Sequence, residues 1–186
     1  MNQSIDQDPD DGKVVSCRSM PNPASSDGGK IRHQTRRALL LGLALLTFGG
    51  NLIWTLLDTA PPTWDPSRHF YIALSYWHAL DFSAENWWLN VMNVEPFYPP
   101  LYHLSLLPFF ALSGFSGDTA VFVNSIYMLV IILSTYGIGA HLYDQRTGLL
   151  AAFLVSCYPI LPYVSRMVMM EAMLTAGVAL TYYFFL

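Results

Sequence analysis

The stretch "TAVFVNSIYMLVIILSTYGIGAHLY", residues 119–143, is apolar over most of its length. A helix of this length reaches about 37 Å at 1.5 Å per residue, which exceeds the ~30 Å hydrocarbon core of a bilayer. The stretch therefore predicts a tilted membrane-spanning helix.

The composition of the whole chain agrees with a membrane protein. Of its 186 residues, 53% are hydrophobic and 12% are charged, whereas soluble domains carry about 25% charged residues. The two cysteines, Cys17 and Cys157, are far apart and give neither a metal-binding spacing nor a disulfide framework. We find no glycine-rich phosphate loop and no basic nucleic-acid patch, so we expect no nucleic-acid partner.

A second apolar segment lies upstream. Residues 38–57, "ALLLGLALLTFGGNLIWTLL", directly follow a basic cluster and precede an acidic flank. The positive-inside rule then places the N-terminus in the cytoplasm and Asp58 outside. Residues 1–29 are rich in acids, Ser, Pro and Gly, and we expect them to form a disordered cytoplasmic tail.

Residues 58–118, between these two spans, have the charge pattern of an external loop. They contain six acids and one base, Arg68. Within the loop, residues 66–80 predict an amphipathic helix at the membrane interface. The apolar piece at residues 101–115 is interrupted by Pro108 and is short for a span, so we expect an interfacial or re-entrant helix.

Two more spans are predicted after residue 143. The first covers residues 148–164, and a short hydrophilic piece, "SRMVMME", separates it from residues 172–186. The last stretch reaches only about 22 Å as a helix. We therefore expect it to be truncated and the chain to be the N-terminal part of a longer polytopic protein.

Two topologies fit this order of segments. If the piece at residues 99–115 does not cross, Arg146 is cytoplasmic and "SRMVMME" lies outside beside the acidic loop. If it crosses, the two loops end on opposite faces. Arg146 favours the first arrangement under the positive-inside rule.

Asp65 allows two interpretations. Asp followed by Pro66 is a good signal for a helix N-terminus, so Asp65 is a candidate helix cap. It is also a candidate catalytic base at the membrane surface, and the two roles are compatible because a carboxylate fixed by its own helix is already oriented.

Other polar residues near the bilayer also allow more than one interpretation. Glu171, at the mouth of an apolar helix, is either a boundary residue paired with Arg166 or a functional acid. Tyr98, Tyr102 and His103 are interfacial aromatic residues or substrate contacts. The histidines show no metal-ligand spacing.

Taken together, these pieces resemble the N-terminal part of membrane glycosyltransferases with the GT-C fold, family 39, which includes protein O-mannosyltransferases and aminoarabinose transferases. The matching pieces, in order, are "TWDPSRHFYIAL", "YPPLYHLSLLPFFALSG", "YGIGAHLYDQRTGLLAAFLVSCYPIL" and "SRMVMMEAML". The resemblance implies an all-α, polytopic bundle with interfacial helices in its first external loop. Residues 30–186 would be the N-terminal part of its transmembrane domain.

The resemblance also implies a reaction. A sugar would move from a polyprenyl-phosphate carrier to a hydroxyl of a lipid, glycan or protein, with inversion, on the external face of a bacterial plasma membrane. Asp65 would be the general base and Glu171 the second catalytic acid. Arg166 and, less strongly, Arg68 would bind phosphate. Many relatives have Glu where this chain has Pro66, so no role is inferred for a paired acid.

Tyr98 and His103 complete the candidate substrate-binding residues. We expect no required cofactor, leave a divalent metal open, and expect the 186 residues alone to be inactive. The alternative function is a polytopic transporter or assembly protein for lipid-linked glycans, whose outer carboxylates would guide passage without chemistry.

Overall fold

The structure, a computed structural model, describes the backbone of residues 24–61 and 64–186 and the side chains from Gln34 onward, apart from residues 62–63. These residues form eight helices and no strand. Most of the predicted disordered segment, residues 1–23, lies outside the described residues. Residues 24–29, also predicted to be disordered, form the first turns of α1, where Ser and Asp are favoured.

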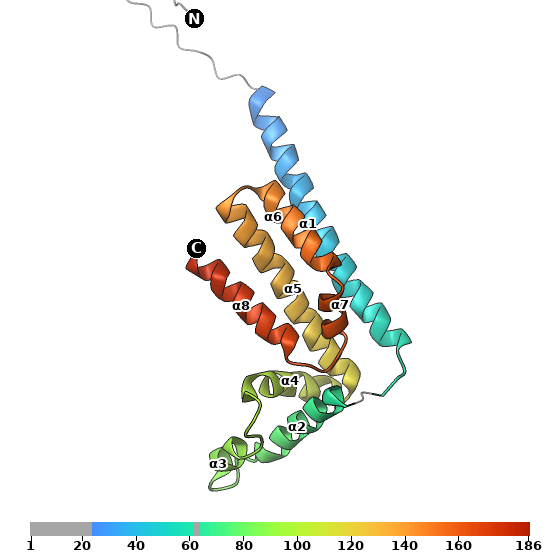
Figure 1. Ribbon diagram of the computed structural model, residues 1–186, viewed down its shortest axis with the longest axis vertical. Helices are drawn as coiled ribbons and strands as arrows, with labels where there is room; N and C mark the ends of the chain where they lie inside the picture. The colour runs from blue at the N-terminus through green and yellow to red at the C-terminus, as the bar shows by residue number, and fades with distance from the viewer. Residues whose placement is uncertain (1–23, 62–63) are drawn as a thin grey trace, which may run out of the picture.

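Four long elements form a bundle (Figure 1): α1 (Ala24–Leu57), α5 (Gly117–Leu142), α6 (Gln145–Cys157) and α8 (Glu171–Phe185). α5 lies at its centre and packs against the other three.

Two contacts show that α1 and α5 run antiparallel. Arg36 Nη1 donates to Gln145 Oε1 over 3.1 Å, at the end of the bundle where α5 finishes. Asn51 Nδ2 donates to Ser125 Oγ over 3.2 Å, near the end where α5 begins.

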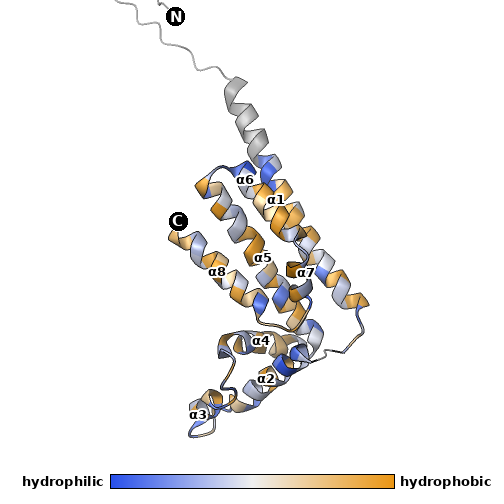
Figure 2. Ribbon diagram, in the orientation of Figure 1, coloured by the Kyte–Doolittle hydropathy of each residue, from blue (hydrophilic) through white to orange (hydrophobic). Residues whose placement is uncertain are grey.

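Two described helices, Gln34–Leu57 and Gly117–Leu142, are long and apolar enough to span a membrane. They cover the segments expected at residues 38–57 and 119–143. Figure 2 shows the hydrophobic colouring along α1, α5 and α8.

The stretch expected as one span at residues 148–164 is divided. α6 ends at Cys157, and a short helix, α7 (Ile160–Ser165), follows after a break at Tyr158 and Pro159. Proline lacks the N–H that would continue the hydrogen-bond ladder, which accounts for the break.

Three helices from residues 58–118 form a layer across one end of the bundle (Figure 1): α2 (Asp65–Ala79), α3 (Trp87–Met92) and α4 (Pro100–Ser113). α2 packs on α4, and α4 packs on α5. α4 starts at a proline, contains Pro108 and does not run along the bundle.

The turn between α7 and α8 lies at the same end as this layer. The Asn124 side chain, near the start of α5, donates to the carbonyl oxygens of Met167 and Met169. Arg146, in the first turn of α6, lies at the opposite end with Gln145. The first of the two topologies requires Arg146 and the turn before α8 to lie at opposite ends of the bundle. Which end faces the cytoplasm stays a prediction.

The layer and the bundle share one apolar core. Its fully buried members come from α2, α4, α5 and the turn before α8, and include Ala73, Tyr76, Tyr102, Leu106, Phe110, Ala120 and Val168. The buried face of α2 consists of His69, Ile72, Ala73 and Tyr76. This shared core holds the external-loop helices in place against α5 and α8.

Small residues bring α5 and α6 into close contact. A Cβ atom added to Gly139 would lie 2.7 Å from Gly148 Cα, and one added to Gly148 would lie 2.8 Å from Ala140 N. The sharp turn between the helices is capped by Asp144, whose Oδ1 accepts from Thr147 N over 2.7 Å. The close approach lets the two backbones pack directly, as small residues do between membrane helices.

We predict that Gly148→Ala lowers the thermal unfolding midpoint, because the new methyl group collides with the α5 backbone at a cost of about 1–3 kcal/mol. Gly42→Ala in α1 is the matched control, since an added Cβ there meets nothing within 4 Å. Both changes gain the same helix propensity. Thermal unfolding in detergent measures the difference, and equal midpoints for the two variants would contradict the close contact.

Candidate active site

The candidate site lies where the helical layer meets the starts of α5 and α8. Asp65 is the first residue of α2, Tyr98 lies just before α4, and His103 is near the start of α4. Arg166 comes from the turn before α8, and Glu171 is the first residue of α8. The Asn124 hydrogen bonds fix this turn against α5. Residues more than 100 positions apart in the chain thus come together at one end of the bundle.

Asp65 is the first residue of α2 and its side chain is exposed. The residue before the helix is Trp64, with φ of 51°, and no side chain caps the helix with a hydrogen bond. The capping interpretation of Asp65 is therefore not realised in the structure. Positive φ in a bulky residue costs about 1–3 kcal/mol and is concentrated at functional sites. Among the described residues, no hydrogen bond or ion pair engages the Asp65 carboxylate.

Glu171 starts α8 and is partly buried. Its Oε2 atom is fully buried and has no hydrogen-bond partner among the described residues. No described ion pair joins it to Arg166, so the boundary-pair interpretation has no support in the geometry. A buried carboxylate oxygen without a partner is costly, and this favours a functional acid over a boundary residue.

Arg166 is held by α1. Its Nε donates to Asn51 Oδ1 over 3.0 Å, and its guanidinium lies 4.8 Å from the centre of the Trp54 ring. It lines a cavity of about 750 Å³ that also borders Pro66, the residue after Asp65. A fixed cation beside a cavity of this size is suited to bind an anionic group.

Asn51 was not identified from the sequence, although it connects three helices. Its Nδ2 donates to Ser125 Oγ and, over 2.8 Å, to Ser165 Oγ, while its Oδ1 accepts from Arg166. The signal was present, because an amide side chain inside an apolar span is a candidate functional or structural residue.

Arg68 has other partners. Its guanidinium lies 3.8 Å from Glu95 Oε2 and 5.3 Å from the centre of the Tyr98 ring, and about half of its side chain is exposed. Glu95 already balances its charge, so Arg68 is a weaker phosphate ligand than Arg166. The Tyr98 ring, which Arg68 contacts, also lies 4.7 Å from the ring of His69, measured between centroids.

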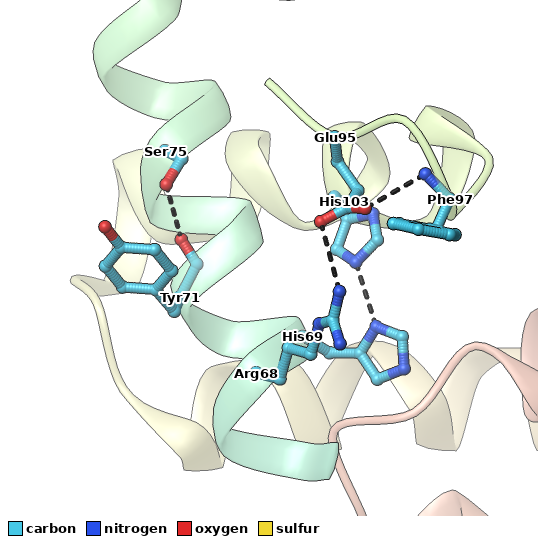
Figure 3. A network of polar contacts seen from close by, with 7 residues as sticks. All are labelled: Arg68, His69, Tyr71, Ser75, Glu95, Phe97 and His103. Carbon is cyan, nitrogen blue, oxygen red and sulfur yellow. Dashed lines mark hydrogen bonds and ion pairs between the residues drawn. The ribbon is translucent and has the colours of Figure 1, made fainter. Parts of the chain in front are cut away.

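A buried pair of histidines joins α2 to α4 (Figure 3). His69 Nδ1 and His103 Nε2 are 3.0 Å apart, and the rings stack with centroids 5.2 Å apart. His103 also stacks on Tyr76 and is completely buried. We therefore assign His103 to holding His69 rather than to direct contact with substrate. His69 was not among the predicted site residues.

Burial keeps both histidines neutral near pH 7. It lowers the pKa of His69, although the negative charges of Glu171 and Asp65 partly oppose this. Burial, together with the neighbouring His69, lowers the pKa of His103 to about 4. Both candidate acids are thus among the charged groups that influence the pKa of His69.

Tyr102 on α4 and Asn124 on α5 are buried next to the histidine pair. Burial raises the pKa of the Tyr102 hydroxyl, which lies beside the Asn124 side chain. Neither Tyr102 Oη nor Asn124 Oδ1 has a partner of good hydrogen-bond geometry among the described residues. Glu171 Oε2 and His103 Nδ1 are likewise buried without a partner of good hydrogen-bond geometry, although the His103 ring interacts with the backbone of Pro99.

The sequence profile of the family described as dolichyl-phosphate-mannose-protein mannosyltransferase matches residues 98–186. The match runs from Tyr98 through α4, α5 and the turn with Arg166 to the end of α8. This part of the chain is therefore similar to a membrane glycosyltransferase of the GT-C type. No curated protein and no solved structure matches the chain.

The match supports an integral membrane protein and, in general terms, glycosyl transfer from a lipid-linked donor to an acceptor. The prediction of an all-helical membrane fold of the GT-C type is confirmed. The family favours glycosyl transfer over the transporter alternative. Asp65 and Arg68 lie outside the matched region, so their roles rest on geometry and on the sequence resemblance.

No group of three His, Cys, Asp or Glu side chains close enough to hold a metal ion occurs in the described part of this chain. We assign no metal ligand.

We predict that acid destabilises the layer formed by α2 and α4. The folded pKa of His103 lies below its ordinary value of 6.5, so the unfolded chain binds more protons between about pH 6.5 and 4. The contribution of His103 to the free energy of unfolding is fully present above about pH 6.5 and is lost as the pH falls through this window. A shift from 6.5 to about 4 corresponds to about 3 kcal/mol.

Thermal unfolding midpoints of the wild type and His103→Phe between pH 7 and pH 4 measure this effect. Phenylalanine keeps an aromatic ring at this position but does not titrate, so the decrease in the midpoint should be smaller in the variant. Identical decreases would show that His103 does not cause the acid sensitivity.

Proposed function

We propose that this protein transfers a sugar from a polyprenyl-phosphate donor to a hydroxyl acceptor on the non-cytoplasmic face of the membrane, with Asp65 as general base. The observation that carries the proposal is that Asp65, at the start of α2, and the turn with Arg166 and Glu171 lie at the same end of the bundle. One acid comes from the first outer segment and the other from the second, and the family match supports glycosyl transfer from a lipid-linked donor.

Asp65 has the properties required of the base. A hydroxyl is a poor nucleophile until a carboxylate removes its proton as the new bond forms. The Asp65 carboxylate is exposed, so an acceptor can reach it. No described side chain forms a hydrogen bond or an ion pair with it. Its position at the start of α2, in a backbone anchored by the buried face of that helix, fixes where the acceptor oxygen must lie.

The chemical step is a direct displacement. Asp65 takes the acceptor proton, and the acceptor oxygen forms a bond to the anomeric carbon. The bond from that carbon to the phosphate oxygen breaks, and the polyprenyl phosphate leaves with the electron pair. Attack opposite to the leaving group inverts the anomeric centre.

Arg166 is placed to bind the leaving phosphate. Charge develops on the phosphate oxygen as the bond breaks, and a preorganised cation stabilises it. The hydrogen bond to Asn51 and the contact with Trp54 fix the guanidinium beside the cavity that also borders Pro66. Glu171 would orient the acceptor or the sugar.

We predict that Asp65→Asn reduces sugar transfer by about 100-fold or more, because a general base contributes factors of this size. The assay uses membranes that contain the protein expressed from its complete reading frame and a radiolabelled polyprenyl-phosphate sugar. Glu85→Gln is the matched control, since Glu85 is an exposed acid of the same outer segment and should leave turnover unchanged. Retained turnover in Asp65→Asn would rule out the base role.

A further inference from the structure

Two buried serines fix the orientation of the Asn51 side-chain amide. Ser125 Oγ donates its proton to Val121 O over 2.9 Å. Ser165 Oγ donates its proton to Pro162 O, also over 2.9 Å. A hydroxyl group has only one proton to donate, so both serine oxygens face Asn51 as acceptors, at 3.2 and 2.8 Å. Only the amide nitrogen of Asn51 can serve them, because the amide oxygen carries no proton.

This orientation directs the amide oxygen of Asn51 toward Arg166. Asn51 Oδ1 accepts from Arg166 Nε over 3.0 Å, and only 3% of Asn51 is exposed. Trp54 lies three residues further along α1, which places it on the same side of the helix. Its ring centre is 4.8 Å from the guanidinium carbon of Arg166. Two side chains of α1 therefore hold the guanidinium, one at Nε and one against a face.

The two terminal amino groups of Arg166 remain available to a ligand. Among the described residues, neither of them forms a hydrogen bond or an ion pair. A guanidinium carries five N–H donors in a planar fork, and Asn51 uses one of them. The paired terminal groups match the geometry of two phosphate oxygens, to which arginine binds through two parallel hydrogen bonds.

The charges around the cavity make the direction of this guanidinium important. Among the described residues that line the cavity of about 750 Å³, Arg166 is the one basic residue, while Asp58 and Asp118 are acids. An anion that enters the cavity can pair with Arg166 and is repelled by the two carboxylates. The place where a phosphate binds is therefore set by where the terminal amino groups of Arg166 point.

We propose that Asn51 is a positioning residue for the phosphate of the lipid-linked donor. It binds Nε of Arg166, keeps the guanidinium against Trp54 and leaves both terminal amino groups to bind the phosphate. Asn51 does not touch the phosphate and acts through Arg166, and the two serines act through Asn51. The identity of the anion as the phosphate of the polyprenyl carrier rests on the proposed function.

Equilibrium binding of radiolabelled farnesyl phosphate tests the proposal on the protein expressed from its complete reading frame, in detergent. Farnesol, which has the same chain without the phosphate, measures the contribution of the lipid. Asn51→Leu should weaken farnesyl phosphate binding about 10-fold or more, as expected for a lost hydrogen bond to a charged group, and leave farnesol binding unchanged. Ser134→Ala is the control, since Ser134 is also buried in α5 but forms no described hydrogen bond with Asn51.

A purely structural role of Asn51 predicts a different pattern. Asn51→Leu would then lower the thermal unfolding midpoint without changing the ratio of farnesyl phosphate to farnesol affinity in the folded protein. An unchanged ratio would overturn the proposal.

Arg166→Lys tests the geometry of the cation while keeping its charge. Lysine has a single amino group and cannot bind Asn51 and two phosphate oxygens as the guanidinium fork does. The variant should therefore bind farnesyl phosphate about 10-fold or more weakly. The double variant Asn51→Leu/Arg166→Lys should be no weaker than Arg166→Lys alone, because Asn51 acts only through the guanidinium. Additive losses would overturn the proposal, and so would wild-type affinity in Arg166→Lys, whether or not Asn51→Leu folds.

Further arms separate this inference from the proposed function. If Arg166→Gln loses farnesyl phosphate binding while Asn51→Leu keeps it, the role of Asn51 fails and that of Arg166 stands. If binding depends on Asn51 while Asp65→Asn keeps full turnover, the role of Asn51 stands and the base role of Asp65 fails. Lysophosphatidic acid presents a phosphate on a membrane lipid, and tighter Asn51-dependent binding of this lipid than of farnesyl phosphate would overturn the link to the donor.

Discussion

The cost of burying a polar group without a partner determines the arrangement at the layered end of this protein. Asn51 joins α1 to α5 and α7, and Asn124 joins α5 to the turn before α8. His69 and His103 join α2 to α4. Each of these links is buried in apolar surroundings, where a lost partner cannot be replaced by water. As a result, the outer segments are held in one geometry although they are far apart in sequence.

That geometry gives the candidate site its chemistry. An unengaged carboxylate at the start of α2 and a half-buried carboxylate at the start of α8 lie at the same end of the bundle. A cation fixed by α1 borders the nearby cavity. A base, an orienting acid and a phosphate ligand are the groups that sugar transfer from a lipid phosphate requires. The family match covers Glu171 and Arg166, and Asp65 lies outside it.

The long apolar segments could be predicted from sequence because length and hydropathy alone decide them. Residues 38–57 and 119–143 both correspond to helices that satisfy the requirements for a span. Pro159 causes the break between α6 and α7. This proline is visible in the sequence, but residues 148–164 were nevertheless predicted as one uninterrupted span. The histidine pair could not be predicted, because His69 and His103 are 34 positions apart. The sequence around each histidine does not indicate that the two side chains are in contact. The structural role of Asn51 was not predicted, because a single polar residue hardly changes the mean hydropathy of its apolar span.

The central claim is that Asp65 and Glu171 lie at the same end of the bundle and on the same side of the membrane, opposite to Arg146. Single cysteines at these three positions (Asp65→Cys, Glu171→Cys and Arg146→Cys), in a background with Cys17→Ser and Cys157→Ser, test it directly. A small membrane-impermeant thiol reagent added to intact cells should label positions 65 and 171 but reach position 146 only after permeabilisation. Labelling of positions 65 and 171 from opposite sides would contradict the account.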